Sequence, residues 1–287
     1  MRLVSYLSAA GPRIAALRGE RYVDLSGGGL PDSMRALLAL GEDGLSRAAA
    51  AAERGAELAP SAVKKLLAPV PDPRKIICVG LNYADHAREG GVAPPDEPVL
   101  FSKFPTALIA HGDAIVLPRV SHQVDYEAEL VVIIGRGGRH IARSRALDHV
   151  AGYCPGHDVS ARDWQMGKPG KQWLCGKSFD TFAPCGPALV TRDEVPQPGK
   201  LGVRFRLNGE TMQDSNTEQF IFPVEEIIAY VSQVCTLEPG DLIYTGTPPG
   251  VGFARKPPRF LKPGDVAEVE IEGLGVLRNP VTAEPAA

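Results

Sequence analysis

The sequence lacks the features that mark membrane-spanning, secreted and nucleic-acid-binding proteins. No apolar run in its 287 residues approaches the ~20 residues of a membrane span. The start of the chain lacks the charged-then-apolar layout of a secretory signal. No long basic run is present, and 31 Lys and Arg stand against 34 Asp and Glu. Composition therefore predicts neither a membrane nor a nucleic acid as a partner.

Cysteines spaced for cross-linking are also missing. The five cysteines are odd in number and no two have C-x-x-C spacing, so we expect a reducing compartment. Without a secretory signal or a span, we expect the protein to be cytoplasmic. Turn-forming residues, in contrast, are plentiful. The 26 prolines and 31 glycines are spread along the chain, which is typical of short strands joined by turns.

The first 70 residues are expected to form a small N-terminal region that ends in a proline-rich linker, residues 69–73. Pro69, Pro71 and Pro73 interrupt regular secondary structure there, and the sequence after them shows strand patterns separated by turns. The elements expected in this region are short strands over residues 2–25, a helix over 33–52 interrupted near Gly41 and Gly44, and a short helix over 61–67.

Residues 71–287 consist mainly of strand patterns. Asn208-Gly209 is typical of a hairpin turn. One helix is expected to start at Pro223, with an apolar stripe of Val224, Ile227, Ile228 and Val231. The strand candidates are 75–79, 100–104, 124–134, 203–207, 242–245 and 269–271. Many strands with few helices predict a β-rich α+β fold and not a doubly wound α/β sheet.

Two carboxylates stand out on the strongest strand, residues 124–134. Glu127 and Glu129 are two apart, so on a strand they share a face with Val131 and Ile133. Two acids heading a buried apolar strand repel each other and lose hydration unless a cation compensates. A hard divalent cation suits carboxylate oxygens. The alternative is a strand whose solvent-facing edge carries two acids, and spacing alone does not separate the two.

Three further polar segments are uninformative singly. Residues 156–165 contain Asp158, Arg162 and Gln165, a composition that by itself favours a surface turn. A single lysine such as Lys177 is uninformative by itself, because most lysines are solvated. Residues 240–252, which include Thr247, run from a strand into a Gly/Thr-rich turn whose N–H and hydroxyl donors suit a carboxylate.

A possible acid–base pair lies in residues 80–91. His86 and Glu89 are three apart and share a face on a helical turn. A carboxylate beside an imidazole orients it and raises its basicity. Gly90-Gly91 would give the segment the flexible exit that a lid needs. Without other support, a surface histidine with a chance acidic neighbour is the simpler interpretation.

Taken together and in order, these segments resemble the signature of the fumarylacetoacetate hydrolase family. The resemblance covers about residues 75–280 and is specific as a set. The segments that carry it are Glu127-x-Glu129, Asp158 to Asp163, Gly176-Lys177-Ser178, and Gly240-Asp241 through Gly246-Thr247-Pro248. The stretches 161–166, 170–173, 179–182 and 213–217 narrow it to the branch of fumarylacetoacetate hydrolase domain-containing proteins.

The resemblance implies a role for each matching residue. Glu127, Glu129 and Asp158 match the ligands of a divalent metal, here Mg²⁺ or Mn²⁺, with Ca²⁺ a further option. Arg162, Gln165, Lys177 and Thr247 match substrate-binding positions, and Lys177 also counts as catalytic. His86 and Glu89 match a catalytic pair on a mobile lid. His157 replaces an asparagine common in relatives and is left out of the ligand set.

The fold implied is the family's mixed β-sandwich roll with a small N-terminal region, and the assembly implied is a homodimer. The activity expected first is hydrolysis of a C–C bond in an acylpyruvate-type or β-diketo acid through a metal-stabilised enolate. The alternatives on the same site are an oxaloacetate tautomerase or decarboxylase, or a 2-hydroxy-dienoate isomerase. A metal-containing binding protein without turnover is the remote alternative. In each case a small oxo-acid is the expected partner.

Overall fold

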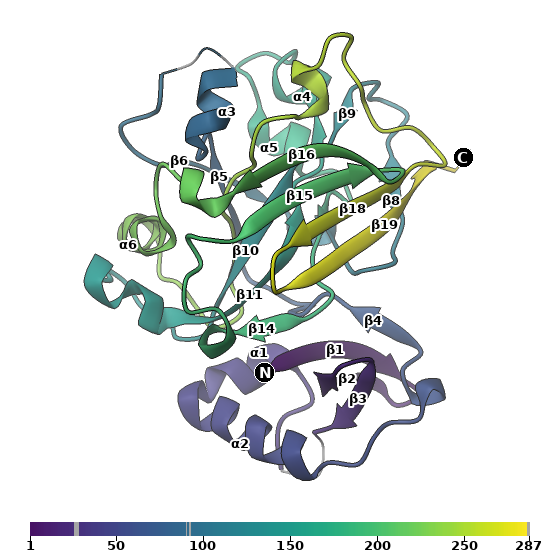
Figure 1. The fold of residues 1–287 in the computed structure, drawn as a ribbon, viewed down its shortest axis with the longest axis vertical. Helices are drawn as coiled ribbons and strands as arrows, with labels where there is room; N and C mark the ends of the chain where they lie inside the picture. The colour runs from purple at the N-terminus through teal and green to yellow at the C-terminus, as the bar shows by residue number, and fades with distance from the viewer. Residues whose placement is uncertain (26–28, 90, 92, 286–287) are drawn as a thin grey trace.

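The computed structural model describes residues 1–25, 29–89, 91 and 93–285, and a ten-stranded sheet runs through it (Figure 1). Its strands are, in spatial order, β3 (Arg21–Asp24), β2 (Gly11–Arg18), β1 (Arg2–Ser8), β14 (Leu189–Thr191), β11 (Val150–His157), β10 (Ala128–Ile134), β17 (Leu242–Tyr244), β5 (Ile76–Gly80) and β6 (Val99–Lys103), with β4 (Lys65–Leu67) also paired to β1. Its neighbouring strands are antiparallel except β17 and β5.

A five-stranded sheet packs in front of β10 and β11 (Figure 1). Its order is β16 (Glu210–Asn216), β15 (Gly202–Leu207), β18 (Val266–Ile271), β19 (Gly275–Ala283) and β8 (Ile115–Leu117). In β18, Val269 and Ile271 are buried while Glu268 and Glu270 are partly exposed. This is the alternation that one buried face requires. The two packed sheets confirm the β-rich α+β prediction.

Two short ladders and six α-helices complete the fold. The ladders pair β9 (Val124–Asp125) with β12 (Ser160–Ala161), and β7 (Leu108–Ile109) with β13 (Ala183–Pro184). The α-helices within the described residues are α1 (Met34–Ala39), α2 (Gly41–Arg54), α3 (Ala84–Glu89), α4 (Arg162–Gln165), α5 (Trp173–Lys177) and α6 (Val224–Val234).

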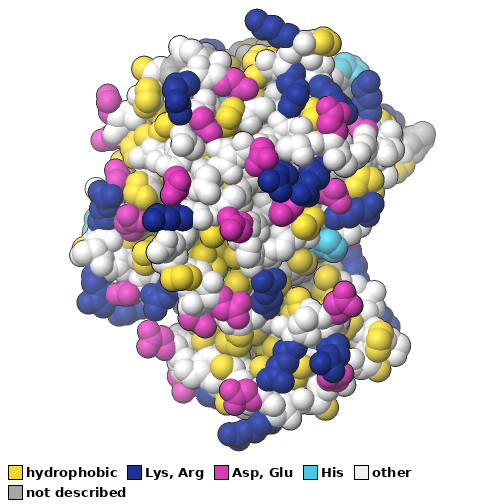
Figure 2. All heavy atoms as spheres, in the orientation of Figure 1, with side chains coloured by type: hydrophobic (Ala, Val, Ile, Leu, Met, Phe, Trp, Pro, Cys, Tyr) yellow, Lys and Arg dark blue, Asp and Glu magenta, His cyan; other side chains and the backbone are white. Residues whose placement is uncertain are grey.

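Several local predictions are confirmed. Asn208 and Gly209 have φ of 55° and 82°, as a type I′ hairpin turn requires. The expected interruption of the first helix falls at Gly41, whose φ is 64°, whereas Gly44, which was named with it, lies inside α2 and does not interrupt that helix. Helix α6 follows Pro223 and buries its predicted apolar stripe. On the face in Figure 2, side chains of both charges are interspersed, in line with the net charge of −3.

The predicted helix over residues 61–67 is wrong. The chain there makes one 3₁₀ turn, Pro60–Ala62, and then enters β4, which pairs with Ser5, Tyr6 and Leu7 of β1. A helix of two turns gains few hydrogen bonds for the residues it orders. Pairing with β1 instead gives the backbone groups of residues 65–67 hydrogen-bond partners in a strand that already belongs to the sheet.

The predicted strand over residues 124–134 is split. Tyr126 and Glu127 lie between β9 and β10, so β9 turns away to pair with β12. All seven residues of β10 are buried, because a sheet neighbour lies on each side and other elements cover both faces. The acidic residues thus sit where a wholly buried strand begins.

The N-terminal region shares the large sheet. Strand β1 pairs with β14, and the region forms the lower lobe in Figure 1. The division at residue 70 stays a prediction, since the sheet is continuous across it. No helix among the described residues is long and apolar enough to cross a membrane.

Replacing Gly156 with alanine is expected to lower the free energy of unfolding by about 1–3 kcal/mol. Gly156 faces Glu129 across the β10–β11 pair, and a Cβ there would lie 2.2 Å from Val131 Cγ2 and 2.8 Å from Tyr244 Cε1. Denaturant unfolding measures the change. Gly199→Ala is the control, since its Cβ would meet nothing within 4 Å. Equal losses in both variants would contradict the packing argument.

Candidate active site

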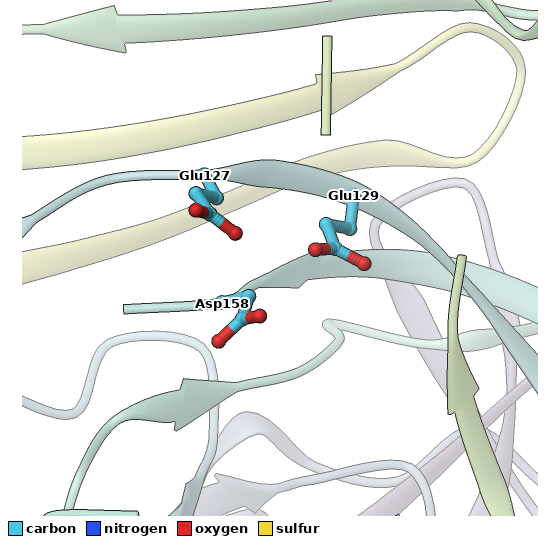
Figure 3. Close-up of side chains that lie close together, drawn as sticks. All are labelled: Glu127, Glu129 and Asp158. Atoms are coloured by element: carbon cyan, nitrogen blue, oxygen red, sulfur yellow. The ribbon is translucent and has the colours of Figure 1, made fainter. Parts of the chain in front are cut away.

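Three buried carboxylates meet where β10 and β11 pair. Glu127 precedes β10, Glu129 lies within it, and Asp158 follows β11, which pairs Ala128 with His157. One carboxylate oxygen from each of the three lies within 4.8 Å of the others, and Figure 3 shows them gathered at one point. Among the described residues, this is the one group of three acidic, His or Cys side chains that could hold a metal.

Two cationic side chains hold Glu127 in place. Lys177, at the end of α5, places Nζ 2.8 Å from Glu127 Oε2 and 2.8 Å from Asp158 Oδ2. Arg162, at the start of α4, donates from Nη2 to Glu127 Oε1 at 2.6 Å and from Nη1 to Gln165 Oε1 at 2.9 Å. The structure therefore brings Lys177, Arg162 and Gln165 to the carboxylates.

Lys103 is a site residue that the sequence analysis missed. Its Nζ lies 2.6 Å from Asp158 Oδ1, and it donates to the backbone carbonyls of Val159, Lys177 and Phe182. The signal available in the sequence was a lysine near the end of the strand predicted over residues 100–104. A buried cation in that position needs an anionic partner.

The buried charges at the site do not balance. Four carboxylates, those of the three acids and of Asp125, face the three cations Lys103, Arg162 and Lys177. One negative charge is left over. Asp158 Oδ1 makes no hydrogen bond although Lys103 Nζ is close.

The pKa values show which acid carries the imbalance. Burial raises the pKa of Glu129 well above its usual range, and the charges of Asp158 and Glu127 add to this effect. Glu129 Oε2 accepts a hydrogen bond from the Gly246 N–H, at 2.7 Å. Burial also acts to raise the pKa of Glu127, but Lys177 and Arg162 outweigh it and lower that pKa to about 2.

These features fit a hard divalent cation. The candidate ligands are all carboxylate oxygens, which suit Mg²⁺, Mn²⁺ or Ca²⁺. The uncompensated charge at Glu129 and the unbonded Asp158 Oδ1 are where a cation would be stabilised. His157 is not part of this group. Its ring packs against Phe205, and burial, helped by the Lys103 charge, lowers its pKa to about 3.

His86 and Glu89 form a pair of their own on α3. His86 Nδ1 lies 3.1 Å from Glu89 Oε2, and the Gly250 N–H donates to both Glu89 oxygens, at 3.1 and 3.2 Å. No hydrogen bond or ion pair of the described residues joins this pair directly to the three carboxylates. Gly90, which was expected to hinge the lid, lies outside the described residues, and closure of the lid stays a prediction.

Thr247 is buried behind the carboxylates. Its hydroxyl donates to the carbonyl of Ala128 at 3.0 Å and accepts from Gln213 Nε2 at 2.8 Å. Gln213 Oε1 in turn accepts from the Ala128 N–H at 2.9 Å. The backbone of Ala128, which lies between Glu127 and Glu129, is thus fixed at both its N–H and its C=O. Gln213 is a second residue whose position the sequence analysis did not interpret.

Comparison with known proteins identifies the class. The model of the fumarylacetoacetate (FAA) hydrolase C-terminal family matches residues 75–282, and the chain belongs to this family. Two relatives are the mitochondrial oxaloacetate tautomerases fahd2 of Xenopus laevis, 48% identical over 98% of this chain and 90% of its own length, and FAHD2A of Bos taurus, 51% identical over 98% and 91%. They confirm the resemblance to the domain-containing branch.

Solved structures confirm the fold and extend the range of activities. A fumarylacetoacetate hydrolase from Exiguobacterium antarcticum is 38% identical, with a TM-score of 0.87 over 99% of this chain and all of that one. Maleylpyruvate hydrolase from Sphingobium sp. SYK-6, solved with manganese(II) and pyruvate, is 31% identical, with a TM-score of 0.83 over 99% and 100%. A 2-hydroxyhepta-2,4-diene-1,7-dioate isomerase from Mycobacterium marinum is 33% identical, with a TM-score of 0.78 over both full lengths. Enzymes of the family depend on divalent metals.

The expectation of a cytoplasmic protein is contradicted. The relatives from Xenopus laevis and Bos taurus are mitochondrial by name. The prediction relied on unpaired cysteines and on the lack of an apolar leader or span. Free cysteines and the lack of a long apolar run do not distinguish the cytosol from the mitochondrial interior.

Glu129→Gln and Glu127→Gln are expected to have opposite effects on the metal-free protein. Glu129→Gln removes the uncompensated charge, and its amide oxygen can still accept from Gly246, so the free energy of unfolding should hold or rise. Glu127→Gln leaves Lys177 and Arg162 short of a partner and should cost about 3–5 kcal/mol. Denaturant unfolding with a chelator present measures both.

The same two variants should both lose Mn²⁺ binding in calorimetry, because each removes a ligand. Full Mn²⁺ affinity in Glu129→Gln would contradict the assignment of this group as the metal site. A large loss of stability in Glu129→Gln would contradict the charge imbalance.

Proposed function

We propose that this protein is a divalent-metal-dependent tautomerase that interconverts the enol and keto forms of oxaloacetate or a closely similar 2-oxo acid. The observation that carries the proposal is the buried group of Glu127, Glu129 and Asp158, held by Lys177, in a chain about half identical to oxaloacetate tautomerases over nearly its whole length. A hydrolase was the first expectation, and these relatives support the tautomerase better.

The cation would be held by Glu127, Glu129 and Asp158, and it would supply positive charge where negative charge develops on the oxo oxygen. Around it, this chain provides hydrogen-bond donors. Lys177 Nζ donates to Glu127 and Asp158, and its third N–H, which has no hydrogen-bond partner in the described part of the chain, can donate to a ligand. Burial acts to lower the pKa of Lys177, but Asp158 and Glu127 outweigh it and raise that pKa, so the ammonium keeps its proton.

Arg162 is suited to the carboxylate of the substrate. Three of its five N–H bonds go to Asp125, Glu127 and Gln165, and the other two have no hydrogen-bond partner among the described residues. A guanidinium fixed in this way presents its remaining donors in one orientation, so little entropy is lost when an anion binds.

The proton that moves at carbon needs its own carrier. His86 is the candidate, because Glu89 fixes its Nδ1 and leaves Nε2 for the substrate or a water. The same pair could activate water for C–C hydrolysis, and maleylpyruvate hydrolase is among the similar structures. Hydrolysis of an acylpyruvate is therefore the second candidate function.

The purified protein is expected to accelerate the loss of enol-oxaloacetate absorbance in the presence of Mg²⁺ or Mn²⁺ and to lose this activity in EDTA. Acylpyruvate hydrolysis and pyruvate release from oxaloacetate are scored separately on the same preparation. Metal-dependent enol loss without product cleavage supports the tautomerase. Cleavage of acylpyruvates at a higher kcat/KM than enol loss would replace it with the hydrolase.

His86→Ala is expected to lower kcat by ~10²–10⁴, the usual contribution of a positioned acid–base group. Mn²⁺ affinity should be nearly unchanged, because no hydrogen bond or ion pair among the described residues joins His86 to Glu127, Glu129 or Asp158. Glu89→Gln should show a smaller loss of the same kind. Full turnover in His86→Ala would mean that Lys177 and the metal suffice for the tautomerisation, and the pair would have no catalytic role.

A further inference from the structure

Asp125 is a fully buried carboxylate with four hydrogen bonds and no role in the mechanism so far. Its Oδ1 accepts from the N–H groups of Tyr126 and Gly252 at 2.8 and 2.7 Å. Its Oδ2 accepts from Arg162 Nε and the Phe253 N–H at 2.8 and 3.1 Å. A carboxylate can accept at both of its oxygens, whereas an asparagine amide in this position would turn its NH₂ group toward two of the four donors.

Asp125 is connected to the three carboxylates through Arg162. Asp125 is in β9, and β9 pairs with β12, which leads directly into Arg162. Arg162 Nε binds Asp125 while Nη2 binds Glu127. The guanidinium that orients Glu127 is therefore itself oriented by Asp125.

Asp125 is also connected to the acid–base pair. The turn of residues 250–253 is tied to Asp125 through Gly252 and Phe253, and to Glu89 through Gly250. Gly252 has no room for a side chain, because a Cβ would lie 2.6 Å from Asp125 Oδ1 and 1.9 Å from the Arg259 carbonyl oxygen. The turn is thus pressed against the aspartate.

We propose that Asp125 is a positioning residue that fixes the His86–Glu89 pair relative to Arg162 and the three carboxylates. The hydrogen bonds form one path, from Glu127 through Arg162, Asp125 and the 250–253 turn to Glu89 and His86. Helix α3 carries the pair on a different element from the carboxylates, so this path links the two halves of the site. The effect of this link on turnover rests on the proposed function, whereas the hydrogen-bond path itself does not depend on it.

Amide hydrogen exchange resolved by NMR tests the link without any substrate. In Asp125→Asn, exchange at Gly250, which touches Glu89 and not Asp125, is expected to become about tenfold faster, the equivalent of one lost hydrogen bond. Asp241→Asn is the matched control. Asp241 is also buried and accepts from two backbone N–H groups and a lysine. It lies just before β17, whereas Gly250 lies beyond the other end of that strand.

The reciprocal variant keeps the test decisive should Asp125→Asn fail to fold. Glu89 is partly exposed, so Glu89→Gln should fold. In it, the Gly252 and Phe253 amides, which touch Asp125 and not Glu89, should exchange faster. Unchanged protection of Gly250 in Asp125→Asn, or of Gly252 and Phe253 in Glu89→Gln, would show that the two contacts are independent and would overturn the proposal.

A double-mutant cycle then tests the consequence for turnover. Asp125→Asn should lower kcat by ~10²-fold through misplacement of the pair. In the Glu89→Gln background the loss should shrink to about tenfold or less, because the share that passes through His86 is already gone and only the share that passes through Arg162 remains. A repeated ~10²-fold loss in that background would overturn the proposal. A wild-type protein without turnover of oxaloacetate would refute the proposed function, while hydrogen exchange would still decide the role of Asp125.

Discussion

The site depends on one constraint, the burial of more negative than positive charge at a single point. Glu127 and Asp158 are each held by lysine or arginine side chains, whereas Glu129 has no cationic partner among them. A carboxylate withdrawn from water without a counter-charge either binds a proton or binds a cation. The raised pKa of Glu129 corresponds to the first state, and a divalent metal would produce the second. The surrounding structure holds the three acids together in spite of this imbalance.

The fold supplies that restraint through backbone contacts. The register of β10 against β11 sets Glu129 opposite Gly156, whose lack of a side chain leaves room for Val131 and Tyr244, and brings Asp158 beside both glutamates. Gln213 and Thr247 fix the peptide of Ala128 between them. Lys103 reaches in from β6 and is itself held by three backbone carbonyls. Side chains from β6, from β16 and from the turn after β17 are thus directed at the backbone and carboxylates of this one point.

The sequence predicted the elements whose cause is local. The two-residue spacing of Glu127 and Glu129, the Asn208-Gly209 turn and the apolar stripe of α6 follow from strand period, turn chemistry and helix period. The role of Asp158 came only from the order of motifs, because its position beside the glutamates depends on strand pairing. The contacts of Lys103, and those of Gly250 with Glu89, are long-range and leave no periodic signal. The helix prediction over residues 61–67 is wrong for the same reason, because β1 provides a pairing partner that the local sequence pattern does not reveal.

Proton release on metal binding is the most direct test of the account. Calorimetric titration with Mn²⁺ in buffers of different ionisation enthalpy gives the number of protons released per ion. At mildly acidic pH the account predicts release of close to one proton per Mn²⁺, because the cation displaces the proton held by Glu129, and the release should fall as the pH rises above the pKa of that group. Glu129→Gln, which is expected to lose Mn²⁺ binding, should show neither the heat of binding nor the proton release. Tight binding with no proton release at mildly acidic pH, or no binding at all, would contradict the claim that a divalent cation balances the buried charge.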